Sequence, residues 1–366
     1  MNYQYKHEQT RWPVLNNKKL LDFRSDTVTK PTQNMYKAMM EAQLGDDVYG
    51  DDPTINELER LSAEITGKDA AMFVPSGTFG NQVSIMTHIQ PGDEVIAGSG
   101  AHIFMHECGS AAKLSGAMMR EANDDKGYML PQDIEKKIRK TEDIHYPRTG
   151  LICLETAHSN GLVIPLEIMH QIKDLAEKYA IPVHVDGARL FNAASFLQAD
   201  VKELTKYCDS LTFCLSKGLC APVGSVVCGS TEFIAKARRN RKSMGGGLRQ
   251  AGILAAAGIV GLNEMRDRLS EDHENALYLG ECLAPLPELE VFQNHIEINM
   301  VFVNHVGTDH SIMDELPAYL LKKGILVNPH EEGVMRFVTN YWTDREACAH
   351  LADTIKAFFK EEHTVE

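Results

Sequence analysis

The sequence predicts an α/β fold in which a mostly parallel central sheet, covered by helices on both sides, is followed by a smaller C-terminal α/β domain. Short apolar runs alternate with amphipathic stretches, which is the pattern of repeated strand–helix units. With 366 residues the chain exceeds the usual size of one compact core. We expect residues 1–50 to form an N-terminal segment with a strand and a turn region, residues 51–270 the large domain, and residues 271–366 the small domain.

Charge restricts the classes of partner. The formal net charge is −14, which disfavours general binding to nucleic acid or to an anionic membrane because both are polyanions. The basic run Lys236–Lys242 indicates a solvated helix face or a subunit contact, with a phosphate-facing role as the alternative. The start of the chain is polar and has no apolar stretch typical of a signal peptide, and no long uncharged stretch spans a bilayer. We therefore expect a cytoplasmic protein.

The eight cysteines form no C-x-x-C pair, and several lie inside apolar runs. This distribution is typical of reduced cysteines that pack in a cytosolic core rather than of a disulfide framework or a zinc site. We predict no metal ligands among them.

The segment Gly45–Thr54 (GDDVYGDDPT) is a turn region rich in glycine and aspartate. Its carboxylates either cap neighbouring structure or hold a cation, and the spacing does not decide between the two. Thr54 and Glu57 match a capping box, which predicts the start of a helix. Four apolar residues share one face of that helix: Ile55, Leu58, Leu61 and Ile65.

A strand–turn–helix unit comes next, with a predicted strand Ala70–Val74 and a predicted helix Gly80–Ile89. Small residues at such a turn expose unpaired N–H groups at the positive end of the helix, which makes a phosphate cradle. The same residues also occur as ordinary N-cap chemistry. The candidates for the cradle are Ser76, Gly77, Thr78 and Phe79.

Polar side chains follow the ends of the next two predicted strands. They are His102 after strand Glu94–Gly98, and Glu155 and His158 after strand Leu151–Leu154. Open α/β sheets bind ligands at this edge. A histidine there can stack on a planar ring or move protons, and the alternative is a loop histidine with satisfied hydrogen bonds.

Asp186 and Lys217 carry the strongest chemical signals. Asp186 ends the apolar strand IPVHVD, where a buried carboxylate needs a partner, either a local arginine such as Arg189 or the protonated ring nitrogen of a cofactor. Lys217 stands between the apolar runs Leu211–Leu215 and Val223–Cys228. A desolvated lysine can form a Schiff base with a carbonyl group. The alternative is the solvated tip of a hairpin.

Together these features predict pyridoxal 5′-phosphate as the cofactor. Lys217 would hold its aldehyde, and Asp186 would keep its ring nitrogen protonated so that the ring accepts electrons. His102 would stack on the ring, and the helix start after Ser76 would bind the phosphate. These four features occur in one chain and in a suitable order.

The last third of the chain predicts the small domain. After Gly247 a helix rich in small residues is expected to continue past Glu271, which favours close helix packing and a subunit contact. Beyond Pro285 the pattern is β-β-α-β-β-α. The expected elements are Glu290–Phe292, Asn299–Val303, Ile312–Lys323, Ile325–Asn328, Val334–Thr339 and Asp344–Lys360.

Five stretches resemble one known family. FRSDTVTKP, GDDVYGDDPT, HVDGARLFNA, CLSKGLCAPVGS and GGGLRQAGILAAAG are similar to the low-specificity L-threonine aldolases, which belong to the fold-type-I pyridoxal-phosphate enzymes and the β-eliminating lyase group. The likeness extends from about Leu21 to the end of the chain. It implies the fold-type-I architecture, with the cofactor bound in the large domain. Many relatives have a glycine where this chain has Cys220.

The resemblance implies a role for each matching residue. Lys217 corresponds to the Schiff-base lysine and Asp186 to the partner of the pyridinium nitrogen. The further cofactor contacts implied are Gly77, Thr78, His102, Arg189 and Arg249. The substrate contacts implied are His158 near the hydroxyl group, and Ser25, Arg189 and Arg336 at the carboxylate.

The implied reaction is the reversible cleavage of L-threonine or L-allo-threonine to glycine and acetaldehyde. His102 or His158, or a water that either one holds, is the expected base for the β-hydroxyl proton. The family implies a homotetramer with sites shared between subunits, where Tyr49 reaches a neighbouring site. The alternatives are a β-eliminating lyase, another aldol-type enzyme such as a serine hydroxymethyltransferase, and a catalytically silent pyridoxal-phosphate binding protein.

Overall fold

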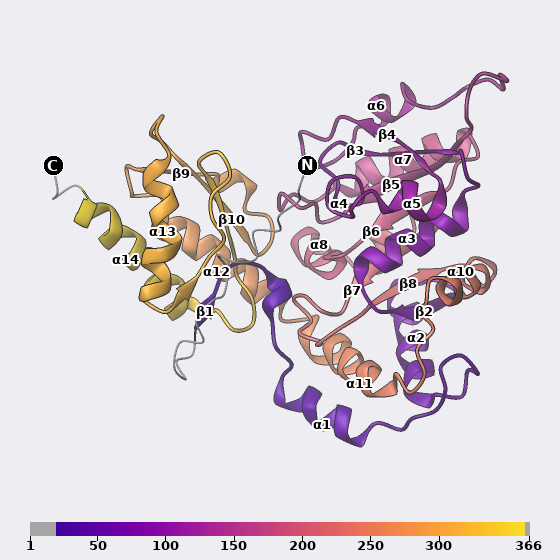
Figure 1. Cartoon of the computed structure of the whole chain (residues 1–366), viewed down its shortest axis with the longest axis horizontal. Helices are drawn as coiled ribbons and strands as arrows, with labels where there is room; N and C mark the ends of the chain where they lie inside the picture. The colour runs from indigo at the N-terminus through magenta and orange to yellow at the C-terminus, as the bar shows by residue number, and fades with distance from the viewer. Residues whose placement is uncertain (1–19, 363–366) are drawn as a thin grey trace, which may run out of the picture.

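The computed structural model describes residues 20–362, so the polar start of the chain, for which no signal peptide is predicted, lies outside the described residues. Two lobes are visible in Figure 1, a larger one built on a seven-stranded sheet and a smaller one built on a three-stranded sheet. No helix among the described residues is long and apolar enough to cross a bilayer.

The large sheet has the strand order β2-β8-β7-β6-β5-β3-β4. From β7 to β4 all neighbours are parallel, whereas β8 is antiparallel to both of its neighbours. The predicted mostly parallel sheet is therefore confirmed. Its strands are β2 (Ala70–Val74), β3 (Glu94–Gly98), β4 (Met118–Ala122), β5 (Thr149–Glu155), β6 (Val183–Asp186), β7 (Ser210–Cys214) and β8 (Ser225–Gly229).

Strand β4 was not predicted. It is an edge strand with the sequence MMREA, and only Ala122 at its end is buried. The inner strands β3, β5, β6, β7 and β8 are buried along their whole length and therefore read as continuous apolar runs. A half-exposed edge strand lacks this signal.

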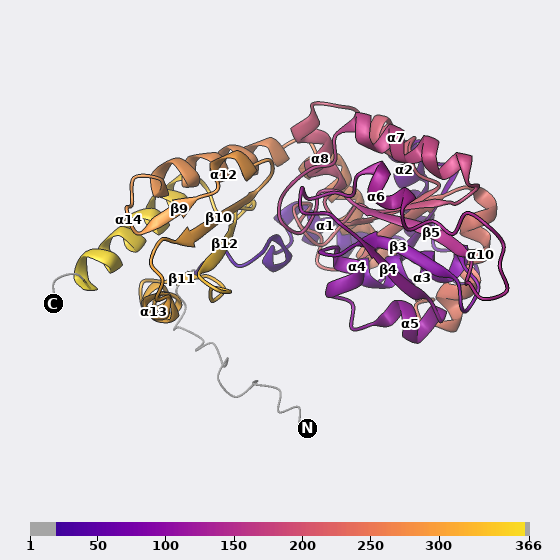
Figure 2. The ribbon, with the colours of Figure 1, turned by 90° about the horizontal axis from the view of Figure 1, so that it is seen from above.

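Helices cover both faces of the sheet, as predicted (Figure 2). One face packs against α3, α5 and α10, and the other against α2, α7, α8 and α9, with α1 and α11 outside α2. These helices and the short ones between them are α1 (Gln33–Glu41), α2 (Pro53–Thr66), α3 (Gly77–His88), α4 (His102–Met105), α5 (Ser110–Ser115), α6 (Pro131–Glu135), α7 (Leu166–Lys178), α8 (Leu190–Leu197), α9 (Val201–Thr205), α10 (Thr231–Ser243) and α11 (Gly252–Val260).

The small lobe contains the predicted elements in the predicted order. Its antiparallel sheet has the order β12-β10-β9, whereas β11 pairs in parallel with β1 from the N-terminal segment. Phe23, next to β1, is buried in the core of this lobe. The expected division at residues 50 and 270 stays a prediction. The elements are β1 (Leu21–Asp22), η1 (Asp26–Val28), α12 (Leu269–Leu283), β9 (Leu289–Val291), η3 (Gln293–His295), β10 (Met300–His305), α13 (Ser311–Lys322), β11 (Ile325–Leu326), β12 (Val334–Val338) and α14 (Arg345–Glu362).

The continuous helix predicted after Gly247 is wrong. Helix α11 ends at Val260, a π-helical turn (η2, Gly261–Met265) follows, and α12 begins only at Leu269. A Cβ at Gly261 would lie 2.9 Å from the carbonyl oxygen of Leu219, so this glycine lets the helix press against the turn that follows Lys217. Beyond the break, α12 takes the chain into the small lobe (Figure 2).

The basic run on α10 is only partly solvated. Arg241 is buried, forms an ion pair with Asp47 at 2.9 Å and donates to the carbonyl oxygen of Phe73 at 2.7 Å. Arg238 forms an ion pair with Glu59 of α2. Two arginines of the run therefore connect α10 to α2, to β2 and to the loop before α2.

The predicted capping box at Thr54 and Glu57 is wrong, because α2 begins one residue before Thr54, at Pro53. The N-cap is the fully buried Asp52, whose Oδ1 accepts from the amides of Thr54 and Ile55 at 3.1 and 3.0 Å. Its Oδ2 accepts from the amide of Gly252 at 2.9 Å, which joins α2 to the start of α11. Proline at the first helical position fits this start.

Replacing Asp52 with alanine is expected to lower the free energy of unfolding by about 2 kcal/mol, because the helix loses its cap and the buried amide of Gly252 loses its acceptor. Glu57→Gln is the matched control. It affects an exposed ion pair with Arg60 and is expected to cost less than about 0.5 kcal/mol. Urea unfolding checks both, and equal losses in the two variants would contradict the assignment of the cap.

Candidate active site

Six predicted site residues line one pocket of about 610 Å³ between the two lobes. They come from six separate parts of the chain: the N-terminal segment, the turns after β3, β5, β6 and β7, and strand β12. The turns lie at the carboxyl edge of the sheet, where open α/β sheets bind ligands. The six residues are Ser25, His102, His158, Arg189, Lys217 and Arg336.

Lys217 lies in the turn between β7 and β8 and is partly buried. Its carbonyl oxygen accepts from Oγ1 of Thr29 and from the amide of Cys220, both at 2.9 Å. Cys220 has a φ of 61°, in the left-handed region that favours glycine. This turn therefore adopts a conformation that favours glycine over cysteine, and the contact with Thr29 fixes the lysine backbone to the N-terminal segment.

Asp186 is buried at the end of β6, beside Glu155 at the end of β5. Its Oδ2 accepts from Nδ2 of Asn81 on α3 at 2.7 Å, and its Oδ1 accepts from the amide of Ala188 at 3.1 Å. The local arginine that the sequence offered as a partner does not pair with it. One of its carboxylate oxygens lies within 4.8 Å of a ring nitrogen of His102, so the carboxylate adjoins the pocket.

Arg189 instead forms a buried, two-pronged ion pair with Asp26. Its Nε and Nη2 donate to the two carboxylate oxygens, both at 2.7 Å. Burial alone would raise the pKa of Asp26, but the charge and hydrogen bonds of Arg189 lower it to about 2. Asp26 was missed in the sequence, although it stands in the RSDT stretch beside Ser25.

Arg336 brings a second guanidinium group to the same pocket from β12. Burial lowers the pKa of Arg336, and the positive charge of Arg189 lowers it further. The buried Asp26 is the carboxylate that acts on both guanidinium groups. Two neighbouring cations that share this carboxylate favour the binding of a further anion. The pair is therefore suited to a carboxylate of the ligand.

The two histidines of the pocket have acidic partners. Nδ1 of His102 lies 3.1 Å from Oε1 of Glu107, and Nε2 of His158 lies 3.3 Å from Oδ2 of Asp124. Burial opposes the charged form of His158, but the nearby carboxylates of Asp124 and Glu155 raise its pKa. Asp124 was not predicted because it follows the unpredicted strand β4. Glu107 stands five positions after His102, but nothing in its turn marks it as a partner of that ring.

Replacing Asp124 with asparagine is expected to lower the pKa of His158, because the ring loses a partner that stabilises its protonated form. We expect activity to fall about 10-fold, since the ring also loses its orientation. NMR titration of the histidine C–H protons measures the pKa. Asp125→Asn, at an exposed neighbouring position, is the control, and an unchanged titration of His158 in the Asp124 variant would contradict the prediction.

The comparisons with known proteins agree with this geometry. The model of the β-eliminating lyase family matches residues 22–306. The low-specificity L-threonine aldolase of Escherichia coli K12 is 42% identical over 339 residues, which cover 93% of this chain and 99% of that protein. The probable low-specificity L-threonine aldolase 2 of Arabidopsis thaliana is 43% identical over 88% of this chain and 92% of that protein. The chain belongs to the low-specificity L-threonine aldolases of the β-eliminating lyase family.

The fold of this threonine aldolase family member also matches solved structures. A threonine aldolase of Leishmania major superimposes with a TM-score of 0.79 at 19% identity, over 92% of this chain and 99% of that one. This likeness confirms the predicted fold-type-I class. Since the identity is only 19%, this likeness supports the fold and no more specific conclusion.

Pyridoxal phosphate, which the sequence predicted, fits the residues present. The start of α3 is open to solvent at Ser76, whose Oγ accepts from the amide of Phe79 at 3.2 Å. Helix α3 begins at Gly77, three residues before the predicted start, so Gly77 and Thr78 lie in its first turn, whose amides have no acceptor within the helix. A Cβ at Gly77 would lie 2.9 Å from Sγ of Cys214, so only glycine brings this turn so close to β7.

Arg249 is not brought to the pocket by the described chain. It lies before α11, is half exposed and pairs with Asp46 at 2.9 Å. The GDDVYGDD loop uses its carboxylates for protein contacts: Asp46 binds Arg249, Asp47 binds Arg241, Asp51 accepts from the amide of Asp46, and Asp52 caps α2. Of the two interpretations left open by the sequence, capping is the one with observed contacts.

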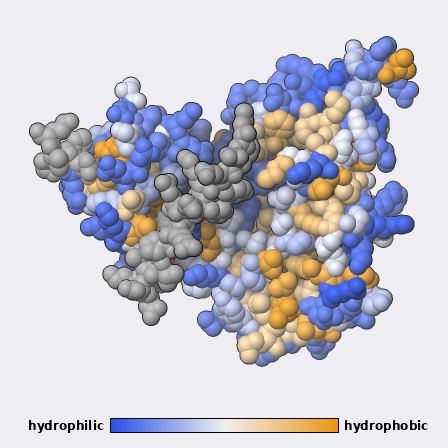
Figure 3. All heavy atoms as spheres, in the orientation of Figure 1, coloured by the Kyte–Doolittle hydropathy of each residue, from blue (hydrophilic) through white to orange (hydrophobic). Residues whose placement is uncertain are grey.

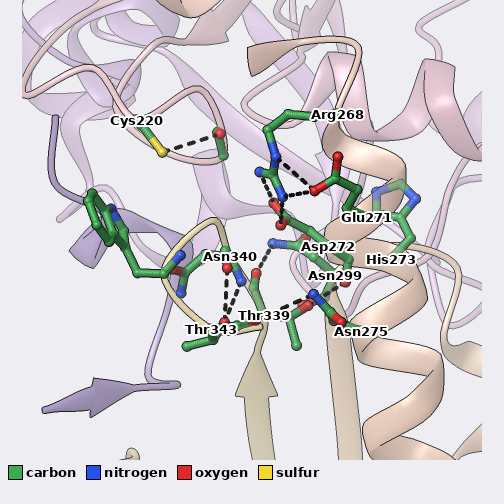
Figure 4. Close-up of polar contacts among 12 residues, drawn as sticks. Cys220, Arg268, Glu271, Asp272, His273, Asn275, Asn299, Thr339, Asn340 and Thr343 are labelled. Carbon is green, nitrogen blue, oxygen red and sulfur yellow. Dashed lines mark hydrogen bonds and ion pairs between the residues drawn. The ribbon is translucent and has the colours of Figure 1, made fainter. Parts of the chain in front are cut away.

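A polar network joins the site to the small lobe (Figure 4). Arg268 pairs with Asp272 at 2.8 Å on α12, and Oγ1 of Thr339 donates to the carbonyl oxygen of Asp272 at 2.6 Å. Asn299 donates from Nδ2 to the carbonyl oxygen of Thr339 at 2.8 Å and to Asp26 at 3.5 Å. Through these contacts the small lobe helps to hold the carboxylate that orients Arg189.

Proposed function

We propose that this chain cleaves L-threonine, L-allo-threonine and related β-hydroxy-α-amino acids to glycine and an aldehyde, with pyridoxal 5′-phosphate as cofactor, and that the reaction is reversible. The observation that carries the proposal is one pocket that brings Lys217 together with the guanidinium groups of Arg189 and Arg336. The buried carboxylate of Asp186 adjoins this pocket beside His102. The 42% identity to curated threonine aldolases over 93% of the chain supports it.

The residues have distinct tasks in this proposal. Bound pyridoxal phosphate supplies an electron sink when the Cα–Cβ bond breaks. Lys217 would hold the cofactor, Asp186 would pair with its ring nitrogen, and the first turn of α3 would bind its phosphate. Arg189 and Arg336 fix the substrate carboxylate with charge-assisted hydrogen bonds, which orients the bond to be cleaved.

The β-hydroxyl proton has two candidate acceptors in the pocket, His102 and His158, either directly or through a water. Nε2 of His158 lies 3.3 Å from Oδ2 of Asp124 and 4.0 Å from Oε2 of Glu155, and its Nδ1 accepts from the amide of Asn160 at 3.2 Å. His102 is anchored through both its ring and its amide, the latter donating to Glu155 at 2.7 Å. Both rings are therefore held in fixed orientations.

The experiment that tests the function measures glycine and aldehyde released from threonine and allo-threonine, with phenylserine as a further substrate. Release of glycine with an equal amount of aldehyde supports the aldolase. Ammonia and pyruvate without glycine would instead indicate a β-eliminating lyase. A protein that binds the cofactor but cleaves none of the three substrates would be a silent binding protein, and the proposal would be wrong.

We also propose a homotetramer in which neighbouring subunits share sites. Exposed apolar side chains gather over α1, the loop before α2 and the start of α11, on the lower part of the face in Figure 3. A patch of this kind is typical of an interface. Arg249 and Tyr49 lie on the same surface, which would bring them to a partner's pocket. The exposed apolar residues are Tyr36, Met40, Leu44, Val48, Tyr49 and Ile253.

Shared sites predict complementation between two inactive variants. Lys217→Ala and Arg249→Ala are each expected to be inactive, but their mixture after subunit exchange should regain about a quarter of the wild-type activity. When subunits pair at random, half of the pairs contain one subunit of each variant. In these pairs one of the two shared sites has both Lys217 and Arg249 intact, and the other site has neither. A mixture that is no more active than the separate variants would contradict shared sites, and sedimentation velocity measures the subunit number.

We propose in addition that the protein is cytoplasmic. All eight cysteines are free, and six of them are buried. Burial raises the pKa of the Cys208 thiol to about 11 and that of Cys228 to about 12, which keeps both thiols protonated and unreactive. Such packing cysteines suit a reducing compartment.

A further inference from the structure

Glu107 is a buried carboxylate to which the proposed reaction assigns no task. It lies in the turn between α4 and α5 and is 2% exposed. Its Oε1 accepts from Nδ2 of Asn81 at 2.9 Å and lies 3.1 Å from Nδ1 of His102. Its Oε2 accepts from Nε2 of Gln82 at 2.5 Å. A carboxylate so deeply buried is held by several partners, and one of these is a pocket histidine.

The amide group of Asn81 connects this carboxylate to the one expected at the cofactor ring. Its Nδ2 donates both to Glu107 and, at 2.7 Å, to Oδ2 of Asp186. Because the amide nitrogen faces two carboxylates, the amide oxygen must face Nε2 of His184 at 3.3 Å, so His184 donates from Nε2. Burial lowers the pKa of His184 to about 3, which leaves this ring neutral.

The neutral ring continues the chain of hydrogen bonds in one direction. With its proton on Nε2, His184 accepts at Nδ1 from Oγ of Ser210 at 2.8 Å, and Ser210 in turn accepts from Nε2 of His88 at 2.7 Å. In this series each group donates to the next one: His88 to Ser210, Ser210 to His184, and His184 to Asn81, whose amide nitrogen donates to the two carboxylates. The orientation of Asn81 is therefore fixed by its surroundings and is not free to reverse.

We propose that Glu107 is a positioning residue for the reaction, which holds the ring of His102 through Oε1 and, through the Asn81 amide shared with Asp186, sets His102 and Asp186 at a fixed distance from each other. This proposal rests on the proposed function. Since Nδ1 of His102 is bound to Glu107, Nε2 is the ring nitrogen left for the pocket.

A cation is the competing use of this cluster. His102, Glu107 and Asp186 offer one ligand atom each, and the three atoms lie within 4.8 Å of one another. However, the N–H groups of Asn81 point at both carboxylates. Their partial positive charge occupies the position in which a cation would bind, so the geometry favours the hydrogen-bonded arrangement.

The charge of Glu107 also acts on the titration of His102. The hydrogen bond to Glu107 raises the pKa of His102, burial lowers it, and the charges of Asp186 and Glu155 raise it further. The pocket also contains His106, which follows α4 and has its ring centroid 5.6 Å away, together with His158, Arg189 and Lys217. On β5, the buried Cys153 is a further titratable group near Asp186 and Glu107. The adjoining part of α3 contributes the neutral amides of Asn81 and Gln82.

The test compares wild type with Glu107→Gln, which keeps the shape and removes the charge, and with Glu121→Gln, an exposed control on β4. The first readout is NMR titration of His102 in the protein free of cofactor, with His102→Asn used to assign the signal. We expect a lower pKa of His102 in Glu107→Gln and no change in Glu121→Gln. The second readout is the equilibrium affinity for pyridoxal phosphate, which we expect to fall about 10-fold.

Activity provides a third readout. We expect kcat of Glu107→Gln to fall about 10- to 100-fold with KM changed less than about 3-fold, because Arg189 and Arg336 are untouched. If Glu107→Gln does not fold, Glu107→Asp replaces it, and its retracted carboxylate should shift the same quantities in the same direction by less. An unchanged His102 titration together with an unchanged kcat would overturn the proposal. If wild type cleaves no hydroxy-amino acid, the proposed function fails while the titration still tests the positioning.

Discussion

Replacing Lys217 with alanine is expected to lower kcat/KM for threonine cleavage by about 10³-fold or more, because the chain would lose the amine that we propose to hold the cofactor and to take part in its exchange with the substrate. The visible absorbance of the bound cofactor is expected to disappear or to shift. Assays of glycine release and absorbance spectra of the purified variant measure the two effects.

The fold should tolerate this change. Lys217 is only partly buried, and the contacts that fix its turn use its backbone: Thr29 and Cys220 both donate to its carbonyl oxygen. The free energy of unfolding should therefore change by less than about 1 kcal/mol. Lys322→Ala, at an exposed position of α13, is the matched control and should retain full activity. A Lys217 variant that kept the wild-type spectrum would refute its assignment as the cofactor lysine.

The sequence predicted the large sheet well because its inner strands are buried on both faces. Asp186 ends such a strand, and Lys217 and His158 follow such strands, so their place at one edge of the sheet could be predicted from the strand ends alone. The edge strand β4 lacks that signal. The helix break before α12 was missed because glycine and alanine permit close packing and helix continuation alike.

The partners of the site residues were harder to predict than the residues themselves. Asp26 is 163 positions from Arg189 in the sequence, and Asn81 is 105 positions from Asp186. Only the topology brings such residues together, and a single aspartate in a polar stretch gives no periodic pattern. Closeness in the sequence suggested a pair that does not form. Arg189 stands three positions after Asp186 but pairs with Asp26.

The ion pair of Asp26 with Arg189 makes stability depend on pH in a defined way. The pKa of Asp26 is lowered from 3.8 to about 2 in the folded chain, and the shift corresponds to about 2 kcal/mol. A carboxyl group with a lowered folded pKa stabilises fully above its unfolded pKa. This contribution is therefore complete above about pH 5 and is lost as the pH falls through about 4 toward 2.

Replacing Asp26 with asparagine is accordingly expected to lower the free energy of unfolding at pH 7 by about 3–5 kcal/mol, since Arg189 then remains buried beside Arg336 without its carboxylate. Urea unfolding from pH 7 down to pH 3 measures the difference from wild type, which should shrink on acidification as wild type loses the same charge. Asp267→Asn, an exposed control, should unfold like wild type. A difference that stayed constant with pH would show that Asp26 stabilises the chain through its shape and not through its charge. A second measure uses threonine, the proposed substrate, whose carboxylate would supply the counter-charge that Arg189 has lost. Excess threonine should therefore stabilise the Asp26 variant more than it stabilises wild type.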